Sequence, residues 1–279
     1  MRLSLVTFVV ALGLIRAAVA SAQDPREFVE QARAATERFK DQAVATTEGY
    51  VKVGPDFPAM GEHWVNGELV VRGEFDAARP AILTYTTIRG ERTLTGAVYA
   101  IALGPGQKVP DALLGAHWHD HVGSIDEESL LFGHDGMTGG GGDSVRLAVM
   151  HAWVWVDNPA GTFATDNWSL PFARVGAQAP PNVPPEAARA MSLVGGGDAY
   201  YAMLFASIGQ LEERHAEAVR GIVARHAERV SGWWRLRGGE VSRQDLDWLA
   251  ASWASLEADV ARAVPAAAAK RLKRIWMSR

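Results

Sequence analysis

The stretch VRLAVMHAWVWV, residues 145–156, decides the fold that the sequence predicts. Apolar side chains dominate both of its alternating faces: Leu147, Val149, Trp153 and Trp155 share one with His151, and Ala148, Met150, Ala152, Val154 and Val156 form the other. Successive side chains of a strand point to opposite faces, so such a pattern indicates burial on both sides. Residues 144–156 are therefore expected to form a strand between two covering layers.

Further extended segments and an opening helix surround this strand. Alternating apolar residues between turns rich in Gly, Pro and Asp predict strands over residues 68–72, 81–88 and 93–103. Asp24 can cap a helix that has Pro25 in its first position, with apolar residues at helical spacing up to Gly49. This pattern predicts an α+β domain over residues 23–176, with an N-terminal helix and a mostly antiparallel sheet.

The chain changes character at a proline-rich linker, residues 177–185, which can hold neither a regular helix nor a central strand. Beyond it the apolar residues from Leu204 to Trp233 recur with a period of 3.6 and predict one long amphipathic helix. Ser242 and Asp245 resemble a capping box for a second helix, which Pro265 ends before a short third one. Residues 186–279 are expected to form a helical hairpin or small bundle.

The first 22 residues are typical of a secretory signal peptide, with Arg2, an apolar run and a small-residue site at Ala20-Ser21-Ala22. We expect the mature chain to begin at Gln23, to lack a transmembrane segment and to be periplasmic or secreted. Cleavage would leave 26 of the 28 basic residues against 32 acidic ones, a balance that argues against nucleic acid as a partner. The chain has no cysteine, so a metal site could use only nitrogen and oxygen ligands.

Histidines provide the main lead to function, because six of the eight lie between positions 63 and 151. His117, His119 and His121 occupy alternate positions. On a strand they would line one face at steps of about 7 Å. On a helix only His117 and His121 would meet, with Asp120 beside His117. Either geometry offers at least two imidazole ligands for a metal ion.

Several motifs between residues 40 and 168 carry a resemblance to a family. They are a helix end at Gly49-Tyr50, the element Met60-Gly61-Glu62-His63, and the segment His151-Ala152-Trp153-Val154-Trp155 followed by Asn158-Pro159-Ala160-Gly161. Together they resemble a family of secreted bacterial proteins that has no agreed activity. The resemblance implies that His63 and His151 are the positions most worth testing. Relatives often carry a cysteine before the Met-Gly-x-His element, where this chain has Asp56 and Phe57, so a thiol-dependent role does not apply.

The first functional hypothesis is a metal-binding protein or metal-dependent enzyme. His63, His151 and one or two of His117, His119 and His121 would converge on zinc, copper, iron or nickel. In a catalytic version Glu62 or Asp120 would be the candidate general base for a metal-activated water. Haem held by His63 or His151 is a further alternative, although no Cys-x-x-Cys-His attachment motif is present.

A second hypothesis belongs to a different class of protein. The chain would be a non-catalytic envelope protein that binds a small-molecule ligand or forms a homo-oligomer, with its histidines and tryptophans serving core and interface. The helical region favours this, because Trp233, Trp234, Trp248 and Trp253 supply more apolar surface than one thin bundle is expected to cover. The sequence leaves both hypotheses open.

Overall fold

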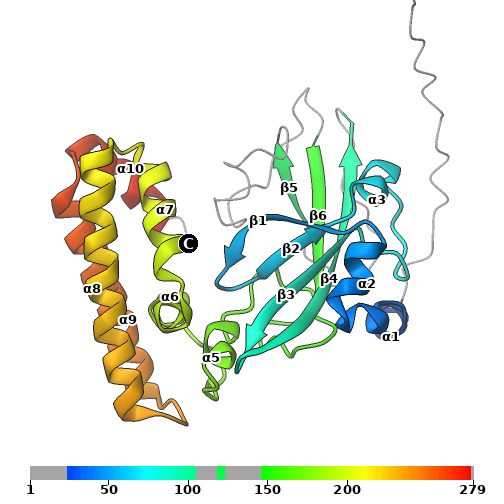
Figure 1. The fold of residues 1–279 in the computed structure, drawn as a ribbon, viewed down its shortest axis with the longest axis horizontal. Helices are drawn as coiled ribbons and strands as arrows, with labels where there is room; N and C mark the ends of the chain where they lie inside the picture. Colours follow the sequence, from blue (N-terminus) through cyan, green and yellow to red (C-terminus); the bar gives the residue numbers. More distant parts are fainter. Residues whose placement is uncertain (1–23, 105–117, 123–145, 278–279) are drawn as a thin grey trace, which may run out of the picture.

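A computed structural model of the chain describes residues 24–104, 118–122 and 146–277 and shows an α+β fold (Figure 1). Its centre is a 6-stranded sheet in the order β1-β2-β3-β4-β6-β5, in which all neighbouring strands are antiparallel. The strands are β1 (Val51–Phe57), β2 (Gly61–Val65), β3 (Ile82–Ile88), β4 (Glu91–Leu103), β5 (Trp118–Val122) and β6 (Arg146–Ala152). The expected α+β class and antiparallel sheet are confirmed.

Strand β6 is the stretch that decided the prediction, and it ends four residues earlier than expected. Ala152 pairs with Ala97 as the last rung of the ladder between β6 and β4. Trp153 then donates its backbone N–H to the carbonyl of Thr162 at 2.8 Å, and Trp155 donates to the carbonyl of Thr95 at 3.1 Å. The apolar residues after Ala152 therefore stay in the core, but their hydrogen bonds go to loops.

One face of the sheet is covered by the N-terminal helices α1 (Pro25–Thr36) and α2 (Gln42–Thr47), with the 3-10 helix η1 (Glu37–Lys40) between them (Figure 1). The carboxylate of Asp24 accepts a hydrogen bond from the backbone N–H of Arg26, as the predicted cap requires. Phe28 packs against Tyr99 with ring centroids 5.0 Å apart. The helix predicted to run to Gly49 is thus broken into three segments.

The strand predicted over residues 68–72 is wrong, because this segment is the helix α3 (Gly67–Arg72). The side chain of Asn66 accepts hydrogen bonds from the backbone N–H groups of Glu68 and Leu69 at 3.1 and 3.2 Å. Gly73 then ends the helix in the left-handed conformation. Capping by Asn66 and Gly73 outweighed the β-branched pair Val70-Val71, which favours a strand.

Helices α5 (Leu170–Arg174), α6 (Pro185–Ser192), α7 (Asp198–Gly209), α8 (Glu213–Arg237), α9 (Arg243–Ala263) and α10 (Ala266–Met277) follow the sheet. The single long helix predicted from Leu204 to Trp233 is wrong, because the chain turns between α7 and α8. Gln210 adopts the left-handed conformation there, with φ 47°. The capping box of Ser242 and Asp245 at the start of α9 is confirmed.

The helical region has its own hydrophobic core, which contains Trp253, Leu256 and Val260 of α9. Trp253 is only 2% exposed, and the rings of Trp233 and Trp248 stack with centroids 4.8 Å apart against the same core. Most of the tryptophan surface that suggested an interface is therefore used within the region itself.

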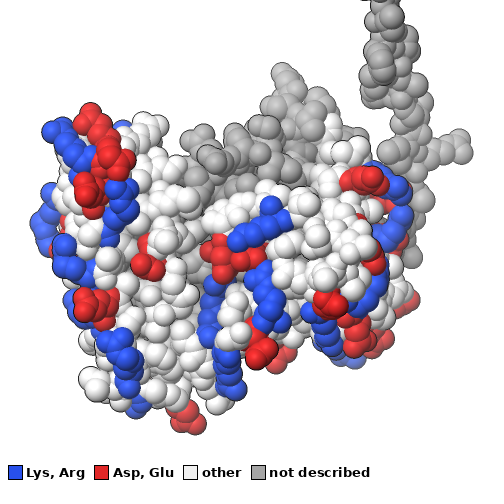
Figure 2. Space-filling model, viewed as in Figure 1, with Lys and Arg blue, Asp and Glu red and all other residues white. Residues whose placement is uncertain are grey.

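The helical region and the sheet meet through α5 and α7. Arg174 of α5 forms two hydrogen bonds, of 2.8 and 2.6 Å, with the carboxylate of Asp56 on β1. On the face shown in Figure 2, basic side chains (Lys and Arg) and acidic side chains (Asp and Glu) are interspersed. Within the described ranges, no helix is long and apolar enough to cross a membrane.

Candidate metal centre

The imidazoles of His63 and His151 lie together on the face of the sheet opposite to α1. His63 is on β2 and His151 on β6, and β3 and β4 separate these strands in the sheet. Three strand spacings in a flat sheet would separate their backbones by roughly 14 Å. The imidazole rings that extend from these backbones have centroids only 5.6 Å apart, at an interplanar angle of 78°. The sheet therefore curves so that this face is concave.

Two features of the sheet allow this curvature. The pairing of β3 with β4 shifts register after Thr84, where Thr95 is inserted as an extra residue on β4. Gly96 follows it, and a Cβ atom added there would lie 2.6 Å from the carbonyl oxygen of Ala152. Since only glycine permits that approach, the end of β6 can fold over towards β2 and bring His151 near His63.

Aromatic rings surround the two histidines. His63 is 7% exposed and His151 2%. Phe57 contacts His63 edge to face, with centroids 5.3 Å apart, and Trp153 stacks on His151 at 6.4 Å. Trp153 is fixed in turn, because its indole N–H donates to the carbonyl oxygen of Ala164 at 2.7 Å. Both imidazoles are thus buried, and an aromatic ring packs against each of them.

The separation of the two rings suits a shared metal ion. A histidine nitrogen lies about 2.0–2.1 Å from zinc, so two ligating rings at the tetrahedral angle have centroids roughly 5 Å apart. The observed 5.6 Å is close to this value. Within residues 24–104, 118–122 and 146–277, however, no three His, Cys, Asp or Glu side chains form a group that could hold a metal ion. A complete site needs a further ligand.

Strand β5 carries the next candidate ligands. The segment is extended, as one of the two predicted geometries required, and pairs with β6 so that His119 is opposite Val149 and His121 opposite Leu147. Val149 and Leu147 alternate with His151 along β6, so these register positions belong to the same face of the sheet as His151. His119 is diagonal to His151 in the ladder. His117, and the side chains of His119 and His121, lie outside what the structure describes.

Glu62, the candidate general base, is not brought to the histidine pair. It follows Gly61 on β2 and is adjacent to His63, so its side chain projects from the opposite face. There its carboxylate accepts hydrogen bonds from Lys52 at 2.9 Å, from the indole of Trp64 at 3.2 Å and from Arg92. Asp120 of β5 is opposite Ala148 of β6 in the backbone ladder, and its side chain lies outside what the structure describes.

Burial and charge act against each other on the pKa of Glu62. Burial, the largest single effect, raises this pKa, but the hydrogen bonds from Arg92, Lys52 and Trp64 together outweigh it and hold the pKa at about 2. The carboxylate is therefore ionised and fully engaged at neutral pH. Through these contacts the charged Glu62 side chain joins β2 to β1 and β4.

The two histidines of the helical region have different surroundings. His226 contacts Asp259 through Nε2 at 2.8 Å and Arg229 through Nδ1 at 3.0 Å. A guanidinium beside one ring nitrogen and a carboxylate beside the other leave no coordinating atom for a metal. His215 lies in the first turn of α8, three residues after the N-cap Glu212, and its backbone N–H donates to the carbonyl of Glu212 at 2.9 Å. The two residues thus belong to a helix start.

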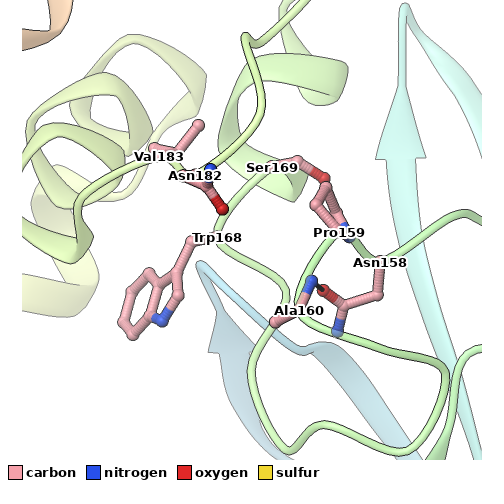
Figure 3. Close-up of a pocket in the computed structure, with 7 residues that line it drawn as sticks. All are labelled: Asn158, Pro159, Ala160, Trp168, Ser169, Asn182 and Val183. Carbon is pink, nitrogen blue, oxygen red and sulfur yellow. Dashed lines mark hydrogen bonds between the residues drawn. The ribbon is translucent and has the colours of Figure 1, made fainter.

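A separate pocket of about 200 Å³ lies near the Asn-Pro-Ala-Gly motif (Figure 3). Its walls combine Asn158, Pro159 and Ala160 with Trp168, Ser169, Asn182 and Val183. The side chain of Asn158 accepts from the backbone N–H of Ala160 at 3.1 Å and donates to the carbonyl of Asp166 at 2.9 Å. Because its hydrogen-bonding atoms are engaged within the loop, the motif shapes this turn.

The sequence did not predict that Phe57 contacts His63, or that Tyr200 contacts Phe57 in turn. Phe57 drew attention only because it lies where relatives often carry a cysteine. Tyr200 is 137 positions after His63 in the chain, so no local pattern connects the two. Gly96 was the one local signal for curvature, because an isolated glycine within a strand pattern indicates a bulge or a close backbone approach.

Comparison of the chain with protein-family models, with curated proteins and with solved structures finds no match.

Proposed function

We propose that this chain binds a divalent transition-metal ion through His63 and His151, with an imidazole of β5 as a further ligand. The observation that supports the proposal is the 5.6 Å separation of the two buried rings, which come from strands that are not neighbours in the sheet. The candidates for this third ligand are His119 and His121, and in the backbone ladder His119 is diagonal to His151.

The chemistry of the pair favours a ligand role. Neutral imidazole is the commonest metal ligand in proteins, and coordination would turn the adjacent rings of His63 and His151, which pack against Phe57 and Trp153, into stabilising contacts. With imidazole ligands and no thiolate, zinc, copper, iron and nickel are the matching ions.

The proposal concerns binding, and it includes no catalytic base. Glu62 is engaged with Lys52, Arg92 and Trp64 on the other face of β2, so it is unsuited to take a proton from water beside His63. We further propose that the site acts outside the cytoplasm, on the basis of the signal-peptide pattern of residues 1–22.

The test is elemental analysis of the mature chain purified without a histidine tag and then exposed to zinc or nickel. Near-stoichiometric metal is expected in the natural chain, with a loss of most of it in His63→Ala and in His151→Ala. His215→Ala is the matched control, because it removes an imidazole from the start of α8 and should leave the metal content unchanged. If neither sheet variant lowers the metal content, the proposal fails and the non-catalytic envelope protein becomes the better hypothesis.

A further inference from the structure

A chain of ring contacts connects the histidine pair to the helical region. Phe57, only 2% exposed, lies between His63 and Tyr200 of α7. Its ring centroid is 5.3 Å from that of His63 at 87°, and 5.8 Å from that of Tyr200 at 67°. Both are edge-to-face contacts, the geometry that aromatic quadrupoles favour. A residue of α7 thus supports the ring that orients His63.

The backbone of Phe57 is also held from the helical side. Arg174 of α5 donates to the carbonyl oxygen of Phe57 at 3.0 Å while it pairs with the carboxylate of Asp56. Opposite Phe57 in the ladder is Gly61, where an added Cβ would lie 2.5 Å from the carbonyl oxygen of Tyr85. The tip of the β1–β2 hairpin is therefore held by both the sheet and α5, and its Phe57 ring contacts Tyr200.

We infer that Phe57 and Tyr200 are positioning residues for the His63 imidazole, so that the helical region completes the metal site. This inference rests on the proposed function. A metal ligand binds more tightly when neighbouring groups already hold its ring in the ligating orientation, because less side-chain entropy is lost on binding. By thermodynamic reciprocity, metal bound at His63 then strengthens the packing of α7 on β1 by the same factor.

The experiment compares zinc affinity, measured by isothermal titration calorimetry, in three variants of the full chain. Tyr200→Leu removes the ring and is expected to weaken zinc binding roughly three- to tenfold, the range for one aromatic pair. Tyr200→Phe keeps the ring and should restore the natural affinity. Phe205→Leu is the control, because Phe205 lies on the same helix but contacts Tyr201 and Trp253 in the helical core.

A second readout tests the reciprocal effect without relying on affinity. Amide hydrogen exchange of α7 is expected to slow when zinc is added to the natural chain, and to respond much less in Tyr200→Leu. Natural affinity in Tyr200→Leu, or an equal loss in Phe205→Leu, would overturn the inference while leaving the metal site in place. Absence of zinc binding in the natural chain would instead remove the proposed function itself, and the inference with it.

Discussion

Glu62 and His63 are neighbours on β2, yet they belong to opposite faces of the sheet and have different physical roles. His63 is packed among rings, whereas Glu62 is held by Lys52, Arg92 and Trp64. The proximity of an acid and a histidine in sequence suggested a base beside a metal ligand. Strand alternation separates them, because consecutive side chains point in opposite directions.

The first prediction concerns the acid sensitivity that Glu62 confers. Its pKa is about 2 in the folded chain against an ordinary 4.5, so on acidification the unfolded chain takes up this proton first. The carboxylate therefore contributes stability above pH 4.5, and this contribution is lost as the pH falls from 4.5 towards 2. Glu62→Gln should lower the free energy of unfolding by about 1–3 kcal/mol at pH 7 and by much less at pH 3.

Urea unfolding of the natural chain and of Glu62→Gln, at pH 7 and pH 3, measures this difference. The same variant should bind as much metal as the natural chain, because Glu62 faces away from His63. A difference in stability that stays constant between the two pH values would contradict the assigned pKa. A loss of metal from Glu62→Gln would restore Glu62 as part of the site.

Within the sheet, the start of β2 depends on Gly61. Its φ of 85° is strained for other residues, and a Cβ there would lie 2.5 Å from the carbonyl oxygen of Tyr85. Gly61→Ala is expected to destabilise the fold by at least about 2 kcal/mol and to weaken metal binding, since β2 must shift with His63 on it.

Gly67→Ala is the matched control for that change. Gly67 is the first residue of α3, and a Cβ there has nothing within 4 Å. Alanine favours the helix, so this variant should be as stable as the natural chain or slightly more stable. Chemical denaturation checks both substitutions, and equal stabilities for Gly61→Ala and Gly67→Ala would refute the role given to the backbone at Gly61.

Several elements could be predicted from the sequence because their signals are local. Strands β3 and β4, the cap of α1 at Asp24 and the capping box of Ser242 each depend on residues within a few positions. Local signals also misled where two of them competed, as at α3. The sequence led us to expect that His63 and His151 converge, but how they do so could not be predicted, since it needs the strand order and the curvature around Gly96, which arise only from the assembled sheet.

The ion pair of Arg174 with Asp56 joins the sheet to α5 and so to the helical region. The Arg174 side chain is 11% exposed and that of Asp56 35%, so this pair is largely shielded from water. Arg174→Met would leave the Asp56 carboxylate partly buried without its partner and should cost about 2 kcal/mol. It should also make the junction near residues 177–185 more susceptible to proteolysis.

Arg220→Met provides the comparison for Arg174→Met. Arg220 pairs with Glu213 at 2.6 Å, but their side chains are 52% and 82% exposed. Water screens such a pair, so its loss should cost less than about 1 kcal/mol. Thermal unfolding combined with limited proteolysis would measure both effects, and a similar small effect for the two variants would mean that the junction does not depend on Arg174.

The most direct test of the central claim is X-ray absorption spectroscopy of the zinc-loaded chain, which reports the ligand type and distance around the metal. The account predicts at least two imidazole nitrogens at about 2.0–2.1 Å, with one imidazole fewer in His63→Ala and in His151→Ala. A zinc shell made only of oxygen, or an imidazole count that neither substitution changes, would contradict a metal site built on the concave face of this sheet.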